Sequence, residues 1–428
     1  MVPAAFAVVI GLGALILSLP ISSEDREWTN GVDALFTSAS AVCVTGLARF
    51  DTADHWSAFG EVTIAVLIQA GGLGVTMYAG FLLLLLGNRL GLRGREFFGM
   101  ELMDVSERDI FRLLRRVMLF IVAVEGATFA LLLPWYLFEN AGIEAVWKSV
   151  FHTISAFNNA GFDLQGGVRG FGGEVDEPYP IAVMGLSALL GSMSFITLFN
   201  MTSPTRRWTL DTRLVVIGMG ALLIAGMGLF LLVETREGRV LDGLGPIQQV
   251  ANSFFLSVNR TTGMSTVDMG AIEDSTTAAL LLLMFIGGAS TSTAGGIKIG
   301  AFMVSMVVVL SALSGRHRAS AFGRDIPQAI VLRAVAVTIL GFFSLGAGVF
   351  ALELTDEFEF LPLMFEVMSA LANVGWSQGI TSEFSHAGSL ILTLLMFLGR
   401  LGPLYVALSI PDQPQTRFRY PEAGVRIG

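Results

Sequence analysis

Four short segments of the chain share one spacing, a serine followed six residues later by a glycine. The pairs are Ser40 and Gly46, Ser155 and Gly161, Ser257 and Gly263, and Ser369 and Gly375. Glycine permits backbone conformations and close approaches that other residues rarely adopt, so such loops can turn backbone carbonyl oxygens toward one point. Rings of carbonyl oxygens replace the hydration shell of a small cation without adding fixed charge. Four such loops around one axis would coordinate a small cation.

We call the three residues that end at each glycine the filter residues. They are Val44, Thr45, Gly46, Asn159, Ala160, Gly161, Thr261, Thr262, Gly263, Asn373, Val374 and Gly375. One such segment alone is typical of an ordinary helix that ends in a glycine cap. Four copies roughly a hundred residues apart instead indicate one unit used four times, with a cation at the filter residues.

The four copies differ from one another. Phe36, Phe151 and Phe365 stand ten residues before their glycines, whereas the third copy has Ser253. We expect these aromatic residues and the four serines to pack the short helices before the loops rather than to contact ions. Trp376, directly after the fourth glycine, is bulky enough to narrow or stiffen its loop.

Two charged residues near the loops have expected structural roles. Arg260, inside the third loop, is expected to turn outward and pair with an acid such as Asp268 or Asp51. Glu366, before the fourth loop, is expected to hold the amides of a neighbouring loop.

The composition indicates a polytopic membrane protein. Hydrophobic residues make up 53% of the chain and charged residues 14%, against about a quarter charged in globular proteins. Residues 2–20 are interpreted as a retained first span because they lack a basic leader and a cleavage motif. The single Cys43 excludes an internal disulfide and is interpreted as a packing residue.

The apolar runs predict an all-α fold with two crossings in each repeat, eight in total. The first spans are 2–21, 113–138, 211–234 and 328–353, and the second spans are 58–87, 179–201, 276–314 and 387–410. Stretches such as 33–42 and 143–157 are too short to cross and predict re-entrant half-helices. The four repeats are predicted to occupy residues 1–88, 89–202, 203–315 and 316–411, and the second of these ranges includes a cytoplasmic connection. Residues 412–428 are predicted to form a cytoplasmic C-terminal tail.

Lysine and arginine are concentrated in the connections on one side of these spans, and acidic residues are frequent on the other side. By the positive-inside rule both termini are cytoplasmic and the glycine loops enter from outside. The expected surroundings are a lipid bilayer, and no nucleic-acid partner is expected.

Glycines also recur in the second spans, at Gly71, Gly191, Gly287 and Gly399. Close helix packing is the favoured interpretation of the first, second and fourth. The third lies in GGASTSTAGG, residues 287–296, which is too small and polar for a continuous helix and predicts an unwound segment inside the membrane.

Five segments together resemble the signature sequences of the Ktr/Trk/HKT superfamily of potassium transporters. They are DALFTSASAVCVTGL, FHTISAFNNAGFD, NRTTGMSTVD, FIGGASTSTAGGIK and MFLGRLGPL. The chain is similar to the KtrB type within this superfamily, because no extra spans precede the first repeat. The resemblance implies four M1-P-M2 units (helix, re-entrant pore half-helix with filter loop, helix) around a pseudo-fourfold pore. It implies potassium uptake across a bacterial or archaeal cytoplasmic membrane, with dependence of the uptake on sodium or on protons left open.

The same resemblance implies a homodimer and regulation by a cytoplasmic nucleotide-binding RCK subunit of the KtrA type, with no organic cofactor in this chain. It also implies a gating loop beneath the filter, and Arg400 as a basic residue near it. The implied gating residues are Gly287, Gly288, Ala289, Ser290, Thr291, Ser292, Thr293, Ala294, Gly295, Gly296, Lys298 and Arg400. A free cationic side chain would repel an ion in the pore, which suits a barrier. The alternative is that Lys298 and Arg400 snorkel or pair structurally.

Two other functions have less support from the sequence. An intramembrane enzyme has little support, because the four histidines are scattered and the common metalloprotease motif is absent from the sequence. An alternating-access carrier would share the interrupted third-repeat span but predicts inverted repeats. The four copies here share one direction, which favours a channel-like route.

Overall fold

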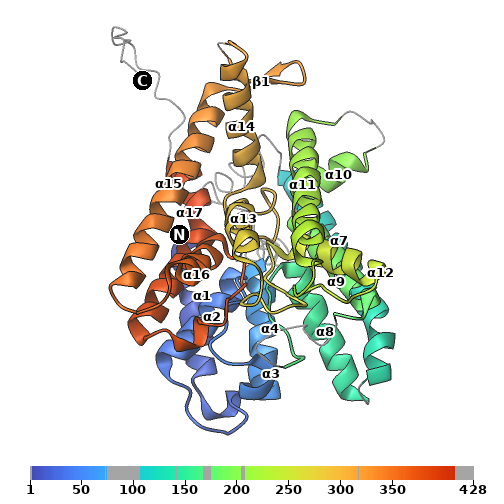
Figure 1. Ribbon diagram of the computed structural model, residues 1–428, viewed down its shortest axis with the longest axis vertical. Helices are drawn as coiled ribbons and strands as arrows, with labels where there is room; N and C mark the ends of the chain where they lie inside the picture. Colours follow the sequence, from blue (N-terminus) through green and yellow to red (C-terminus); the bar gives the residue numbers. More distant parts are fainter. Residues whose placement is uncertain are drawn as a thin grey trace.

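The computed structural model describes residues 2–72, 74, 107–139, 142–166, 175–203, 208–316 and 318–409 of the 428-residue chain. The apolar runs form helices (Figure 1). The sheet found among the described residues is one hairpin of two strands, each two residues long. The predicted all-α architecture is thus observed over these residues.

The helices of the first half follow the repeat order predicted from sequence. They are α1 (Val2–Leu17), the 3-10 turn η1 (Pro20–Ser22), α2 (Gly31–Cys43), α3 (Thr52–His55), α4 (Ala58–Gly72), α7 (Glu107–Glu139), α8 (Ile143–Asn158), α9 (Pro178–Ser192) and α10 (Phe195–Met201). The first span was predicted to end at residue 21, but the helix ends at Leu17 because Pro20 begins a 3-10 turn.

The second half begins with α11 (Leu210–Leu229), continued by the π-helical turn η3 (Phe230–Glu234). It continues with α12 (Pro246–Asn259), α13 (Asp274–Phe285), α14 (Ile299–Leu313), β1 (Ser320–Ala321), β2 (Arg324–Asp325), α15 (Gln328–Glu353), α16 (Phe360–Ala372), the 3-10 turn η4 (Thr381–Glu383) and α17 (His386–Ser409). Four short helices, α2, α8, α12 and α16, each end directly before a filter glycine loop.

Three stretches in the described part of the chain are long and apolar enough to cross a membrane, namely Leu114–Glu139, Leu210–Glu234 and Gln328–Glu353. A fourth is obtained if α9 and α10 count as one bent span. Eight spans therefore stay a prediction. Parts of the predicted divisions, residues 73, 75–106 and 410–428 above all, lie outside the described residues.

The predicted span 179–201 is not one continuous helix. Its helix ends at Ser192, and α10 leaves at 99° to α9. The break occurs at Met193, which is extended, and the Ser194 side chain then caps α10 by accepting the Thr197 amide. The break also leaves the Gly191 and Ser192 carbonyls without helical partners, and these accept the amides of Thr293 and Ala289 instead. The interrupted third-repeat segment thus satisfies the backbone carbonyls at this helix end.

Close packing at the second-span glycines is confirmed in three repeats. A Cβ placed on Gly71, Gly191 or Gly399 would overlap a carbonyl oxygen near the end of a short helix, that of Val42, Phe157 or Leu371 respectively. The missing side chains therefore let α4, α9 and α17 contact the short-helix ends directly.

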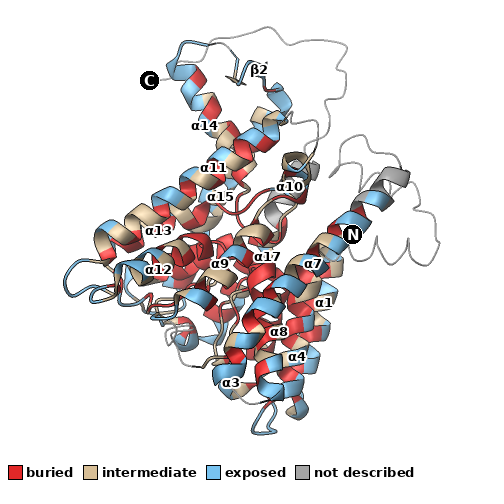
Figure 2. Ribbon diagram, turned by 90° about the vertical axis from the view of Figure 1, so that its right-hand side faces the viewer, coloured by how far each residue is buried: buried red, intermediate tan, exposed pale blue. Residues whose placement is uncertain are grey.

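Buried residues gather in the middle of the bundle, around α8, α9 and α17, whereas the outer faces of α1, α7 and α15 carry exposed residues (Figure 2). Many of these exposed residues are large and apolar, among them Leu15, Leu119, Phe343 and Phe350. An extensive apolar outer surface is what a bilayer covers.

Candidate functional site

The filter glycines all require a left-handed backbone. Gly46, Gly161, Gly263 and Gly375 have φ values of 95°, 77°, 82° and 102°. The residue that caps the short helix before the loop is also left-handed in three copies, at Val44, Asn159 and Asn373. In the third copy Arg260 is right-handed, so this loop leaves its helix differently.

The four loops abut one another in a closed ring. A Cβ on Gly46 would lie 2.6 Å from the Ala160 carbonyl oxygen. The same construction at Gly161, Gly263 and Gly375 overlaps the carbonyl oxygens of Thr262, Val374 and Thr45. Each glycine thus faces the residue before the next glycine in chain order, and the fourth returns to the first. The loops share one centre, and a side chain at any of these glycines would collide with the neighbouring loop.

In addition to their predicted packing, three of the four spaced serines bond to the loops that follow them. Ser40 and Ser369 accept the amides of Gly46 and Gly375 at 3.0 and 2.9 Å. Ser155 donates to the carbonyl oxygen of Phe162 at 2.6 Å. In these three copies the serine therefore fixes the loop at or beside its glycine, which explains the constant spacing.

The third serine, Ser257, has a different partner. Its hydroxyl donates to the Leu223 carbonyl oxygen of α11 at 2.8 Å. The third loop is held elsewhere, and this is a second respect in which the third copy departs from the others.

Asn159 and Asn373 connect neighbouring loops through their side chains. Oδ1 of Asn159 accepts the Thr262 hydroxyl at 2.6 Å, and Nδ2 of Asn373 donates to the Thr45 hydroxyl at 3.0 Å. Both asparagines are fully buried. Two opposite repeats thus use one residue type to hold the loop that follows in the ring.

The prediction that Arg260 turns outward to an acid is wrong. The side chain is 3% exposed, and its guanidinium donates to the Leu283 carbonyl oxygen at 3.1 Å and to that of Ile286. Because α13 ends at Phe285, these carbonyls lack helical partners, and a buried cation can satisfy them. Arg260 therefore fastens the third filter loop to the point where α13 ends.

The prediction that Glu366 holds the amides of a neighbouring loop is wrong, because its partners lie in its own repeat. Its Oε1 accepts the Gln378 amide at 3.1 Å and the Ser377 hydroxyl at 2.5 Å, and Oε2 accepts the Thr381 hydroxyl at 2.9 Å. These donors belong to the chain that follows the fourth filter loop, so the carboxylate stiffens that turn.

The contacts of Trp376 show why a bulky side chain fits directly after the fourth filter glycine. Its ring is 1% exposed, and Nε1 donates to the Met264 carbonyl oxygen at 3.1 Å. The indole therefore joins the third and fourth loops behind the ring of glycines.

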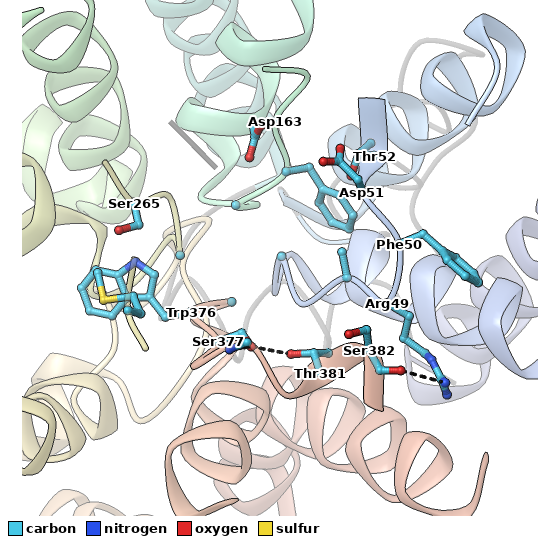
Figure 3. Close-up of a pocket in the computed structure, with 18 of the residues that line it drawn as sticks. Arg49, Phe50, Asp51, Thr52, Asp163, Ser265, Trp376, Ser377, Thr381 and Ser382 are labelled. Carbon is cyan, nitrogen blue, oxygen red and sulfur yellow. Dashed lines mark hydrogen bonds between the residues drawn. The ribbon is translucent and has the colours of Figure 1, made fainter. Parts of the chain in front are cut away.

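A cavity of about 200 Å³ opens at one end of the ring and is lined by all four filter glycines. Figure 3 shows it surrounded by all four repeats, with Asp51, Asp163, Ser265 and Ser377 each contributed by a different one. Burial raises the pKa of Asp163 to about 6, and the nearby Asp51 carboxylate adds to this effect. Asp163 was not among the residues predicted to be functional, although its position two residues after a filter glycine was a signal.

At the opening of this cavity, Arg49 is already neutralised. Its Nε lies 3.2 Å from Oδ1 of Asp33, and its guanidinium also donates to the Ser382 carbonyl oxygen (Figure 3).

The predicted unwound segment is observed between α13 and α14, at residues 286–298. It folds back on itself, with a bond from the Gly287 amide to the Ile297 carbonyl oxygen. The Thr293 hydroxyl donates to the carbonyl oxygens of Gly191 and Phe157 at 2.9 and 3.1 Å. The unwound segment is thus fixed to the end of α8, directly below the second filter loop.

Both cationic side chains near the unwound segment are bound to carbonyl oxygens. Lys298 donates to Ala294 at 2.6 Å. Arg400 donates to Thr293 at 2.5 Å on one side and to Gly71 and Gly72 at 2.6 and 2.9 Å on the other. Arg400 therefore bridges α17, the end of α4 and the unwound segment.

A polar cluster within the helices was missed from sequence. Gln69 donates to Glu125 at 3.0 Å, and Asn158, at the end of α8, donates to Gln69 at 2.7 Å. The signal was a carboxylate within the apolar run 113–138.

Comparisons with known proteins agree over nearly the whole chain. The family described as "TrkH: Cation transport protein" matches residues 4–418. The chain is 36% identical to "Ktr system potassium uptake protein B" of Bacillus subtilis, covering 99% of this chain and 95% of that protein. It is 32% identical to "Potassium/sodium uptake protein NtpJ" of Enterococcus hirae, covering 100% of this chain and 96% of that protein.

A solved structure has the same fold. The crystal structure of the potassium transporter TrkH from Vibrio parahaemolyticus superposes with a TM-score of 0.70 and 18% identity, over 96% of this chain and 84% of that one. At this identity the likeness concerns the fold alone.

Proposed function

Because the chain belongs to the TrkH family of cation transport proteins, we propose that it takes up potassium through an axial pore with the four glycine loops as its filter. Membership in this family identifies the chain as a cation transporter rather than an enzyme. The observation that carries the proposal is the closed ring in which each filter glycine faces the carbonyl oxygen of the next loop.

In the proposed filter, carbonyl oxygens of the filter residues replace the water around a potassium ion. The four short helices end at the ring, and the C-terminal end of a helix carries a partial negative charge that favours a cation. All four glycines are present, which favours potassium over sodium. Sodium is the second candidate ion, since one relative is named a potassium/sodium uptake protein.

In the proposed gate, the unwound segment obstructs the pore below the filter. Two contacts of Thr293 support this role, one with Asn159 of the second loop and one with Arg400 of α17. Opening requires the segment to move away from the pore, which breaks the bonds between Arg400 and Thr293. In the closed position, Lys298 and Arg400 hold the unwound segment in place, and their charges are bound to its carbonyl oxygens.

The proposed assembly is a homodimer in a bacterial or archaeal cytoplasmic membrane, with eight spans in four M1-P-M2 repeats and both termini in the cytoplasm. A separate nucleotide-binding RCK subunit of the KtrA type is proposed to regulate it. The name of the relative "Ktr system potassium uptake protein B" supports a transporter of several components.

Potassium uptake in a strain that lacks its own uptake systems tests the proposal, measured with and without external sodium. We expect the full chain to restore growth at low potassium and to carry rubidium as a tracer. Failure to restore uptake by a protein that reaches the membrane would contradict the proposed function.

A further inference from the structure

An apolar cavity of about 300 Å³ lies apart from the filter ring, between α15, α16, α17 and the end of the unwound segment. Its wall includes Phe285, Ile297, Met368 and Leu371. None of the residues that line it is charged, and Ser344 supplies the one hydroxyl side chain. Such a lining selects an uncharged, aliphatic occupant.

The cavity opens sideways at the middle of a membrane-spanning helix. Leu340 and Leu398 line it and are 47% and 42% exposed, whereas Ile297 and Met368 are 7% and 4% exposed and form its interior. Leu340 lies near the midpoint of the 26-residue helix α15, which is long and apolar enough to cross a bilayer. The midpoint of such a span lies in the hydrocarbon core, where acyl chains are the surrounding solvent.

We propose that this cavity binds an acyl chain of a bilayer lipid. An apolar cavity of about 150 Å³ is enough to hold benzene, so about 300 Å³ accommodates part of an alkyl chain. The chain enters between Leu340 and Leu398 and lies against Ile297 and Met368.

The bound chain contacts the unwound segment where it returns to α14. Ile297 pairs with Ile286 across the ends of the segment, and a Cβ on Gly341 of α15 would lie 2.6 Å from Cδ1 of Ile297. Occupancy of the cavity therefore acts on the position of Ile297. Any effect on gating rests on the proposed function, but acyl-chain binding does not.

Photo-crosslinking tests the site with the full chain in phosphatidylcholine vesicles that contain a fraction of phosphatidylcholine with a diazirine near one acyl-chain end. Mass spectrometry then maps the labelled residues. We expect labelling of Ile297 and Met368, which are nearly inaccessible from bulk lipid, as well as of the outward-facing Phe343, which is 73% exposed.

The variant Ser344→Phe places a ring in the cavity and is expected to abolish labelling of Ile297 and Met368 while Phe343 stays labelled. Ser344→Ala is the matched control and should keep the interior label. Labelling confined to Phe343 in the unaltered protein would overturn the proposal, as would crosslinks to a second copy of the chain at the cavity. Because labelling is independent of ion flux, its outcome separates this site from the proposed transport function.

Discussion

Asn159 and Thr293 are joined side chain to side chain, with Nδ2 of the asparagine donating to Oγ1 of the threonine at 2.8 Å. The same asparagine accepts the Thr262 hydroxyl through Oδ1. One buried amide therefore connects the second loop, the third loop and the unwound segment. If the segment moves to open the pore, this amide must find another partner, so filter and gate are linked at one residue.

Replacing Thr293 with valine is expected to raise basal ion flux. The change keeps the side-chain shape but removes the hydroxyl bonds to Gly191, Phe157 and Asn159. Leaving a buried hydrogen-bonding group without its partner costs about 1–3 kcal/mol, so the closed position should weaken by roughly fivefold or more. Rubidium flux into proteoliposomes measures this change. Thr293→Ser keeps the hydroxyl and should resemble the unaltered protein, whereas equal flux in all three proteins would contradict the link.

Replacing Gly263 with serine is expected to reduce discrimination between rubidium and sodium. The residue has φ of 82°, and a Cβ would lie 2.7 Å from Cα of Gly375, so both loops must shift. A left-handed non-glycine residue costs about 1–2 kcal/mol, so the loop is expected to leave this conformation. Displaced carbonyl oxygens no longer fit the preferred ion, and the rubidium to sodium flux ratio should therefore fall.

The control for this experiment is Gly220→Ala. Gly220 lies in α11 with open space at its Cβ position, so the alanine should leave selectivity and folding unchanged. An unchanged rubidium to sodium ratio in Gly263→Ser would remove the support for the filter assignment.

Asp163 predicts a pH dependence of uptake. Its pKa is raised to about 6 by burial, so the carboxylate is neutral below that pH and negative above it. A negative charge in the cavity concentrates cations. Uptake from dilute potassium should therefore fall as external pH drops from about 7 to about 5, where the group is protonated.

The variant Asp163→Asn should have lower uptake at neutral pH and lose the pH-dependent step near 6. Asp54→Asn is the control, because Asp54 is exposed in α3 and does not line the cavity. A step that persists unchanged in Asp163→Asn would assign the titration to another group.

Replacing Arg400 with methionine is expected to raise basal flux, because it frees the Thr293 carbonyl oxygen and those of Gly71 and Gly72. Arg400→Lys should be intermediate, since a single ammonium group cannot reproduce the planar fork of the guanidinium. Melting temperatures of the purified variants show whether the fold survives. Lower flux in a folded Arg400→Met protein would argue against Arg400 as a residue that holds the gate closed.

Periodicity and repetition were enough to predict the short helices and the unwound segment. The stretches 33–42 and 143–157 match α2 and α8, because a short apolar run followed by glycine has few alternatives. The break between α9 and α10 was not the favoured prediction, since Gly191 was interpreted as a site of close helix packing rather than of a break. The bend is stabilised by partners a hundred residues away, the amides of Ala289 and Thr293.

The partners of Arg260 were also not predictable from the sequence. From the sequence its charge suggested an acidic partner, yet it bonds to the carbonyl oxygens of Leu283 and Ile286. These acceptors exist only because α13 stops at Phe285, which a local pattern around Arg260 does not reveal.

The sequence by itself determined the fourfold spacing, the glycines of the loops and the position of the unwound segment, because each depends on residues close together in the chain. Only the tertiary structure decided how the copies meet. The closed ring from Gly46 to Gly375, the amide of Asn159 shared between filter and gate, and the bridge made by Arg400 all join segments far apart in sequence. A hydrogen bond depends on distance and direction in space, and these are fixed only when all four repeats pack together.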